Sequence, residues 1–282
     1  MVSPEEMKDI RDMIVEDYGE GDVTTESLID SEIIASAEIM TNEDGYVSGT
    51  PETMAVFNEF ELECVCKVSD GDKIWAGQEL MKIEGPLKDI LASERVALNL
   101  LSRMSGVATA TMEMIERAKK VNEDVKIAAT RKTIPLHRYF DKRAVESVGG
   151  EPHRYHLGDF VLIKDNHLRF VGSVKEAVKK ARRAGLSNKI EVEVTNSGEA
   201  EEAVRAGADI VMLDNFSPEE VKEAVESLKE KGIREDVVIE SSGGIDPSNV
   251  GKYAAAGVDV ISSSYMTMKA PALDIKLDVV EE

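Results

Sequence analysis

Short stretches of alternating apolar and polar residues mark the first third of the chain. Such alternation is typical of strands with one buried face, and it occurs at residues 33–40, 46–47, 61–68 and 79–84. Apolar residues at helical spacing predict helices over residues 4–18 and 51–59. Turn signals such as Asp70-Gly71-Asp72 separate the strands. We therefore predict an α+β, sandwich-like N-terminal domain over residues 1–102.

From about residue 93 the pattern changes to long helical periodicity, broken by short runs of apolar, often β-branched residues. A helix is predicted over residues 94–115, with Gly106 as its one weak point. The apolar runs lie at residues 125–130, 160–164, 189–194, 209–214, 236–241 and 258–263. Helical patterns between the later runs lie at residues 173–184, 197–206, 217–231 and 246–256. Strands of this kind alternating with helices are typical of a parallel sheet. The fold class is thus α/β, with an incomplete (open) β/α barrel over residues 103–270 and a C-terminal tail, residues 271–282, that packs back on the N-terminal domain.

The charge of the chain is unevenly distributed. Its 282 residues include 34 Lys and Arg against 55 Asp and Glu, which gives a formal net charge of −21. Such an acidic balance argues against a nucleic-acid or anionic-membrane partner, because both need a basic surface. Between Arg131 and Arg169, however, eight basic residues stand against five acidic ones, 8 − 5 = +3, and all four histidines lie there. The cluster predicts an electropositive pocket in an acidic shell, with a chance cluster on a solvated surface as the alternative.

Other sequence features exclude several classes of protein. No segment carries the apolar run of about 20 residues that a membrane-spanning helix needs. The first residues are acidic and amphipathic, unlike a secretion signal, so we expect a cytoplasmic protein. Cys64 and Cys66 lie too close along one predicted strand for an ordinary disulfide and are interpreted as packing residues. Neither a strand followed by G-x-G-x-x-G nor a G-x-x-x-x-G-K-[ST] loop occurs, so the sequence excludes the nucleotide-binding folds that carry these motifs.

Polar residues end nearly every predicted strand of the second domain. In a β/α barrel these positions line the mouth where active sites are built. Arg131, His153, Arg154 and Lys164 form a cationic group whose mutual repulsion a bound polyanion would relieve. We interpret the group as a carboxylate site, and a Schiff base on Lys164 is the alternative.

Two further groups suit phosphate chemistry. The turn at residues 241–244, followed by a helix predicted to begin at Asp246-Pro247, exposes backbone N–H groups to an anion. Glycines of a plain turn are the alternative interpretation. Glu193 and Asp214 end consecutive strands and are hard oxygen ligands for Mg²⁺ held jointly with phosphates. Their alternative role is in salt bridges to the cationic group. Together the groups predict a substrate that bears a pyrophosphate.

Eight motifs follow one another along nearly the whole chain. They are EDYGEGDVTTE (16–26), ERVALNLLSRMSGVAT (94–109), TRKT (130–133), PHR (152–154), VLIKDNH (161–167), EVEV (191–194), MLDN (212–215) and ESSGG (240–244). As a set they resemble the quinolinate phosphoribosyltransferase family. The resemblance implies transfer of the phosphoribosyl group of phosphoribosyl pyrophosphate to quinolinate with Mg²⁺, giving nicotinate mononucleotide, pyrophosphate and CO₂. It also implies a homodimer, or a higher oligomer, whose sites use residues of both chains.

The resemblance further implies a role for each matching residue. The ligands of the two quinolinate carboxylates would be Arg131, His153, Arg154 and Lys164, with Arg95 reaching in from the partner chain. The residues in contact with phosphoribosyl pyrophosphate and its metal would be Lys132, Glu193 and Asp214. The 5′-phosphate would bind at Ser242 and Gly243. The catalytic set is thus Lys132, Lys164, Glu193 and Asp214.

Among the positions that depart from the family pattern, four leave the acceptor open. Leu136 and His137 stand in a segment that usually reads Pro-Gly-Leu-Arg. Ser264 and Met268 replace a glycine and a histidine of the phosphate-side segment, where Ser264 is a candidate substrate ligand. The alternatives are a phosphoribosyltransferase for another acceptor, such as nicotinate, and a non-catalytic anion-binding protein.

Overall fold

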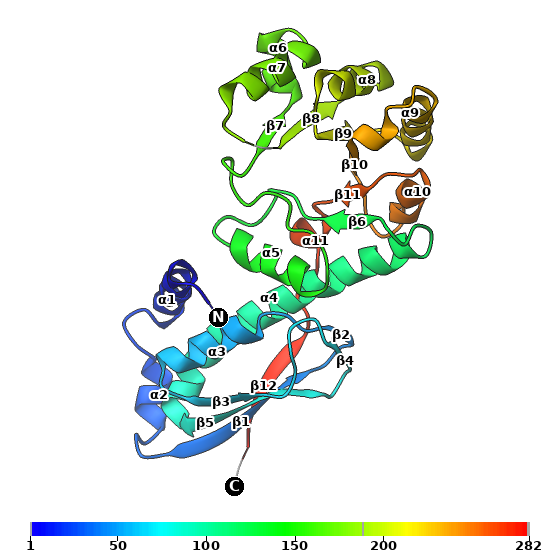
Figure 1. Ribbon diagram of the computed structural model, residues 1–282. Helices are drawn as coiled ribbons and strands as arrows, with labels where there is room; N and C mark the ends of the chain where they lie inside the picture. Colours follow the sequence, from blue (N-terminus) through cyan, green and yellow to red (C-terminus); the bar gives the residue numbers. More distant parts are fainter. Residues whose placement is uncertain (1, 188, 281–282) are drawn as a thin grey trace. The chain divides into compact units, whose positions relative to one another are not determined.

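The computed structural model describes residues 2–187 and 189–280, which divide into two compact units (Figure 1). The first unit is Met1–Ala110, Ile134–Gly149 and Lys269–Glu282, and the second is Thr111–Thr133 and Gly150–Met268. The domain boundary predicted after residue 102 falls inside one continuous helix, α4 (Leu87–Lys119). No helix within the described ranges is long and apolar enough to cross a membrane.

An antiparallel sheet of order β12-β1-β5-β3 forms the centre of the first unit. Its strands are β1 (Ile34–Thr41), β3 (Glu63–Cys66), β5 (Glu79–Pro86) and β12 (Ile275–Val280). A small sheet pairs β2 (Gly45–Tyr46) with β4 (Lys73–Ile74). The helices are α1 (Pro4–Tyr18), α2 (Val23–Leu28), α3 (Thr50–Glu59), the start of α4, and α5 (Arg138–Ser147). The α+β prediction is confirmed, and the C-terminal strand β12 pairs with β1. The pattern missed α2, β4 and β12, which are short or at the edge of a sheet.

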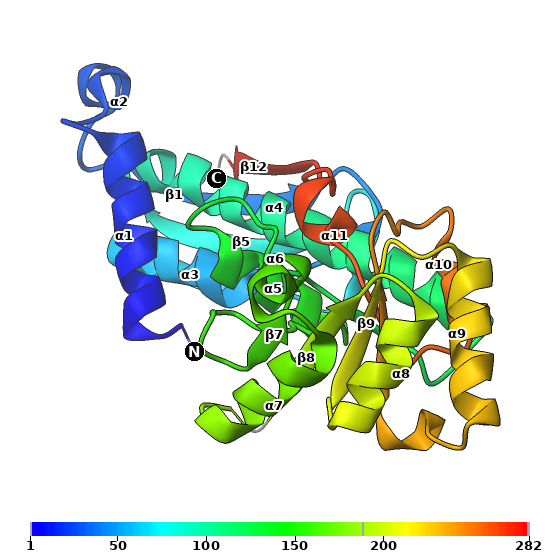
Figure 2. The ribbon, with the colours of Figure 1, turned by 90° about the horizontal axis from the view of Figure 1, so that it is seen from above.

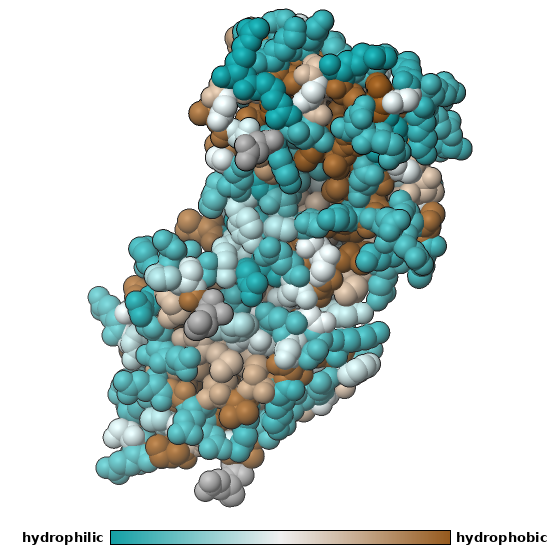
Figure 3. Space-filling view, in the orientation of Figure 1, coloured by the Kyte–Doolittle hydropathy of each residue, from teal (hydrophilic) through white to brown (hydrophobic). Residues whose placement is uncertain are grey.

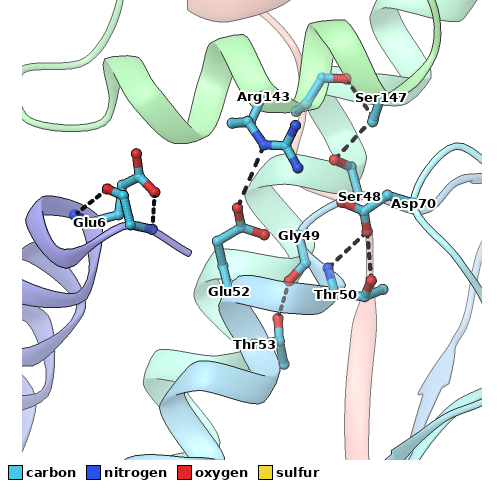
Figure 4. A network of polar contacts seen from close by, with 11 residues as sticks. Glu6, Ser48, Gly49, Thr50, Glu52, Thr53, Asp70, Arg143 and Ser147 are labelled. Carbon is cyan, nitrogen blue, oxygen red and sulfur yellow. Dashed lines mark hydrogen bonds and ion pairs between the residues drawn. The ribbon is translucent and has the colours of Figure 1, made fainter. Parts of the chain in front are cut away.

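The segment 134–149 belongs to the first unit, although the sequence placed it in the barrel. Polar contacts join its helix α5 to the region around α3 (Figure 4). Ser147 Oγ donates to Ser48 Oγ at 3.1 Å, and Arg143 Nε lies 4.0 Å from Glu52 Oε1. Since Glu52 is buried, the guanidinium of Arg143 offsets part of the cost of burying a carboxylate. These contacts explain why the segment packs with the first unit.

Six parallel strands form the sheet of the second unit, in the order β6-β11-β10-β9-β8-β7. They are β6 (Lys126–Ala128), β7 (Val161–Ile163), β8 (Ile190–Val194), β9 (Ile210–Asp214), β10 (Val238–Ser242) and β11 (Val260–Ser262). The helices are the end of α4, α6 (Asp165–Val171), α7 (Val174–Ala184), α8 (Ser197–Ala206), α9 (Pro218–Glu230), α10 (Val250–Ala255) and α11 (Tyr265–Met268), with the 3₁₀ turn η1 (Arg234–Asp236). In the described chain β6 and β7 are the two edges of this sheet, so the predicted open β/α barrel is confirmed.

Helices α7, α8 and α9 lie along the outer face of this curved sheet (Figure 2). Their starts follow the sequence closely, because Ser173, Asn196 and Ser217 each accept a hydrogen bond from a backbone N–H of the first turn. Around α6, α7 and α8 the surface is mainly hydrophilic (Figure 3). The charged residues of these helices therefore face solvent, and those of α7 are mostly basic.

Alternation along the parallel strands separates the helix side from the interior of the barrel. Val192 of β8, Val211 of β9 and Ile239 of β10 belong to the core beneath the helices. Their neighbours Glu191 and Glu240 point to the other side of the sheet, because successive side chains of a strand face opposite ways. The interior of this barrel is thus not filled by apolar layers, which leaves room for a polar site.

Candidate active site

The strand register gathers the polar strand-end residues of the second unit. Leu162 pairs with Glu191, which sets Lys164 beside Glu193 two residues further on. Asp214 pairs with Ser242 across the neighbouring strands. Because parallel strands present their carboxyl ends at one edge, residues far apart in sequence share one opening.

A cavity of about 450 Å³ opens at this edge, a volume in the range of small-molecule sites. All but two of the predicted site residues line it: Arg131, Lys132, His153, Arg154, Lys164, Glu193, Asp214, Ser242 and Gly243. Asn215, the strand-end neighbour of Asp214, lines it as well, and so do Glu240 and Ser262, to which the sequence gave no role.

One wall of the cavity is cationic. Arg154 is 6% exposed and its guanidinium lies 5.9 Å from the centre of the Phe160 ring. Burial, and then the positive charge of Arg131, lower the pKa of Arg154. Arg131 Nε is buried and makes no hydrogen bond within the described residues. A buried guanidinium donor without a partner, beside a second guanidinium, fits a site built for an anion.

His153 continues this wall toward the interior of the barrel. Its Nε2 atom lies 3.2 Å from Glu191 Oε2 and 3.5 Å from Glu240 Oε2. Burial alone would lower the pKa of His153, but the two carboxylates outweigh it together and raise this pKa to about 9. A pKa in this range favours the cationic form of the imidazole at neutral pH.

Glu193 and Asp214 form an acidic wall of the same cavity. Lys164 Nζ donates to Glu193 Oε2 at 2.6 Å, and Asn215 Nδ2 donates to Asp214 Oδ2 at 2.6 Å. Burial, and then the negative charge of Glu193, raise the pKa of Asp214, while Lys164 and Lys132 oppose the shift. Salt bridging by Glu193, which the sequence left as an alternative, is thus present in the structure. It accompanies a pair of acids that repel each other and suit a cation.

The glycine turn after β10 also lines the cavity, through Gly243 and Gly244. Gly243 has φ +101°, and a Cβ atom there would lie 2.4 Å from Asn215 Oδ1. Glycine is required here because other residues would be both strained and too large. The predicted helix start at Asp246 is wrong, since α10 begins at Val250. Asp246 instead accepts hydrogen bonds from the backbone and hydroxyl of Ser248, which forms a turn before the helix.

Comparisons with known proteins decide the family. The family model described as quinolinate phosphoribosyl transferase, C-terminal domain, matches residues 107–278, and the corresponding N-terminal domain matches residues 22–105. The chain belongs to the quinolinate phosphoribosyltransferase family. A protein of Methanothermobacter thermautotrophicus named probable nicotinate-nucleotide pyrophosphorylase [carboxylating] is 43% identical over 271 residues, 96% of this chain and 97% of that protein.

Two further relatives agree with this family. A protein of Archaeoglobus fulgidus with the same name is 46% identical over 261 residues, 93% of this chain and 99% of that protein. The solved structure of the nicotinate-nucleotide pyrophosphorylase from Francisella tularensis is 35% identical, with a TM-score of 0.91 over 99% of this chain and 98% of that one.

Two predicted site residues of this quinolinate phosphoribosyltransferase homologue do not line the cavity. Arg95 lies on the part of α4 that belongs to the first unit, where it forms an exposed ion pair with Glu94 at 3.2 Å. Ser264 lies beyond the end of β11, and its carbonyl accepts the Met268 N–H at 2.8 Å. In this part of the chain the serine that lines the cavity is Ser262, two residues earlier at the end of β11.

The departures from the family pattern also lie outside the cavity lining. Leu136, which stands where the family usually has glycine, adopts φ +65° and is 85% exposed. The backbone thus keeps a conformation that favours glycine. His137 precedes the first residue of α5 in the first unit, and Met268 is half exposed on α11. None of these three side chains belongs to the described lining of the cavity.

Proposed function

We propose that the protein transfers the phosphoribosyl group of phosphoribosyl pyrophosphate to quinolinate and decarboxylates the product to nicotinate mononucleotide, a step of NAD biosynthesis. The observation that carries the proposal is one cavity with a cationic wall, an acidic wall and a glycine turn, in a chain of this family. Quinolinate is a dicarboxylate, which matches the cationic wall. The donor bears a 5′-phosphate, which matches the glycine turn, and a pyrophosphate, which matches the acidic wall through Mg²⁺.

The cationic wall would bind the acceptor. Arg131, Arg154 and His153 would each donate to a carboxylate oxygen, and Lys164 lines the same cavity. Charge-assisted hydrogen bonds of this kind contribute about 1.5–3 kcal/mol each. The unpartnered Nε of Arg131 supports this role, because an acceptor carboxylate would satisfy it.

The phosphates would bind at the other side. Lys132 follows β6 in the chain and lines the cavity, and Ser242 with Gly243 would offer a hydroxyl and a backbone N–H to the 5′-phosphate. Glu193 and Asp214 are hard oxygen ligands that suit Mg²⁺, and their mutual repulsion supports a cation between substrate and protein. When bound, Mg²⁺ supplies charge neutralisation for the pyrophosphate.

The reaction would proceed by two bond exchanges. The bond between ribose C1′ and pyrophosphate breaks, pyrophosphate leaves with the electron pair, and the ring nitrogen of quinolinate bonds to C1′. Glu193 and Asp214 would stabilise the positive charge that develops on the ribose. The bond to the 2-carboxylate then breaks, CO₂ leaves, the cationic ring takes up the electron pair, and a proton replaces the carboxylate. The chain mainly positions the reactants and excludes water.

A mixing experiment tests the proposed assembly, a cytoplasmic homodimer in which Arg95 completes the partner's site. Arg95→Ala and Lys164→Ala would each be inactive alone. After subunit exchange, heterodimers that carry both defects on one site and none on the other would regain part of the wild-type rate. If activity does not return although sedimentation shows dimers, Arg95 does not act across the interface.

The activity itself is tested with purified protein, quinolinate, phosphoribosyl pyrophosphate and Mg²⁺. We expect nicotinate mononucleotide and one CO₂ per turnover, loss of activity in excess EDTA and its return with Mg²⁺. Neighbouring residues give a matched pair: Arg131→Ala should raise the KM for quinolinate, and Lys132→Ala the KM for phosphoribosyl pyrophosphate. Faster turnover of nicotinate than of quinolinate would favour another acceptor, and no turnover of any acid would favour an anion-binding protein.

A further inference from the structure

Two buried carboxylates face His153 from the interior of the barrel. Glu191 of β8 is 0% exposed and Glu240 of β10 is 1% exposed, and they lie 3.2 Å and 3.5 Å from the same atom, His153 Nε2. Both occupy inward positions two residues before a cavity residue, Glu193 and Ser242 respectively. They are therefore built into the floor of the proposed acceptor site without lying at its mouth.

The backbone supports the histidine in this position. His153 has φ +53°, a left-handed conformation that few residues other than glycine adopt. Such a conformation costs about 1–2 kcal/mol and persists where the surroundings hold it. Phe160 packs against the imidazole, with the ring centres 5.2 Å apart. The imidazole is thus held between the Phe160 ring and two acids.

The two carboxylates meet His153 as ion pairs rather than through hydrogen bonds. Both oxygens of Glu191, Oε1 of Glu240 and Nε2 of His153 are buried and make no hydrogen bond within the described chain. Burying a carboxylate without compensation costs several kcal/mol. The positive groups that face this pair are His153, whose Nε2 lies near both acids, and Arg154, whose charge acts on Glu191. An imidazolium at His153 leaves the cluster of two acids and two bases neutral.

A divalent cation is the competing occupant. The three side chains could hold one, because a ligand atom of each lies within 4.8 Å of the others. A dication with Arg154 would, however, leave one uncompensated positive charge in a buried cluster. It would also take up Nε2 of a neutral imidazole and leave the ring less able to bind an anion. Charge balance therefore favours the imidazolium.

We propose that Glu191 and Glu240 are positioning residues, which turn the Nε2–H of a cationic His153 into the barrel so that its Nδ1–H binds a carboxylate of the acceptor. The role rests on the proposed function, because it assigns the acceptor to this wall. Within the described residues the ion pairs of His153 run through Nε2, and the side chain lines the cavity. The raised pKa of His153 agrees with this arrangement.

The state of His153 is measured first, in the full chain without substrate. The chain has four histidines, so ¹⁵N-imidazole NMR with a His153→Asn reference assigns the signal. We expect both ring nitrogens of His153 to be protonated at pH 8, where an ordinary histidine is neutral. A neutral ring overturns the proposal. So does one equivalent of a divalent metal in elemental analysis together with a metal-shifted ring nitrogen.

The two acids are then tested through kinetics. Glu191→Gln or Glu240→Gln should raise the KM for quinolinate about tenfold at pH 8. Without one of the acids His153 loses its positive charge at this pH, so its charge-assisted hydrogen bond to the quinolinate carboxylate becomes a neutral one. The KM for phosphoribosyl pyrophosphate should change less than about twofold, and lowering the pH to 6 should restore much of the loss by protonating His153. Glu151→Gln, which removes an exposed carboxylate paired with Lys126, is the matched control.

The outcomes separate this inference from the proposed function. Equal changes in both KM values, or a loss that does not depend on pH, would show a general structural role and overturn it. Should one variant fail to fold, the other variant and the NMR measurement on the wild type still decide. If quinolinate is not a substrate but the ring is cationic and the variants weaken binding of another acid, the proposed function fails and the positioning role stands.

Discussion

Gly106 lies within α4, and replacing it by alanine sets two opposing effects against each other. Alanine has the higher helix propensity, which favours the variant by about 0.8–1.0 kcal/mol. A Cβ atom at this position would, however, lie 2.0 Å from the carbonyl oxygen of Pro271 and 3.0 Å from its carbon. Both residues belong to the first unit, so the clash occurs inside one compact body.

The size of the clash decides the sign. Ordinary contact begins at 3.4 Å, so the segment at Pro271 must retreat by 3.4 − 2.0 = 1.4 Å. The obstacle is backbone, and Leu273 N–H donates to Ser102 O at 3.0 Å, which ties the segment to the same helix. Overpacking of this kind costs about 1–3 kcal/mol. We take the upper value of about 3 kcal/mol for the clash and subtract the gain of about 1 kcal/mol in helix propensity. Gly106→Ala should then lower the free energy of unfolding by about 2 kcal/mol.

A second helical glycine provides the control. At Gly251 in α10 the nearest atom to an added Cβ is Arg117 O at 3.7 Å, an ordinary contact. Gly251→Ala should therefore raise the free energy of unfolding by about 0.5–1 kcal/mol. Urea unfolding followed by circular dichroism measures both variants. If Gly106→Ala stabilises the protein as Gly251→Ala does, the close approach of Pro271 is wrong.

Three further changes test the site and the core. Gly243→Ala, with φ +101° and a Cβ 2.4 Å from Asn215 Oδ1, should raise the KM for phosphoribosyl pyrophosphate about tenfold or more with an unchanged far-ultraviolet spectrum; an unchanged KM would remove the turn from the phosphate site. Arg103→Leu leaves the fully buried Asp141 carboxylate without its two hydrogen bonds of 2.9 and 3.1 Å from Arg103. It should lower the free energy of unfolding, measured in urea, by about 3–5 kcal/mol, and adding Asp141→Asn should recover part of this loss. Since folding raises the pKa of His153 from 6.5 to about 9, the stability it contributes is full below pH 6.5 and lost as the pH rises through 9. The difference in unfolding free energy between wild type and His153→Asn should then fall by about 3 kcal/mol over this window, and a flat difference would contradict the assigned charge.

The parallel strands were predictable because burial on both faces makes each strand nearly continuous in apolar residues. The ends of those strands were predictable for the same reason, since the first polar residue after the run marks the opening of the barrel. Helix α5 was not predictable, because its buried residues include Asp141 and Lys142, and hydropathy treats both as exposed. Its place in the first unit depends on ion pairs such as that of Arg103 with Asp141, which no local pattern reveals.

Glu191 and Glu240 escaped the sequence analysis for a different reason. Each stands inside a run that reads as buried strand, where a carboxylate looks like an exception rather than a signal. A sign was nevertheless present, because each acid precedes a strand-end polar residue by two positions and therefore shares its face. An inward-facing acid two residues before the carboxyl end of a parallel strand therefore indicates a charged group in the barrel interior, directly below the site.

The two buried acids also show that a negative net charge does not exclude an anionic ligand. A barrel interior is usually filled by branched apolar side chains. Here Glu191 and Glu240 replace such side chains, and an acid in that place is stable when a cation is held against it. His153 and Arg154 are those cations, and they form the wall that faces the cavity. The acidic chain thus holds its anion-binding wall in place by means of its own negative charges, so acidic residues inside the barrel favour an anionic ligand rather than oppose it.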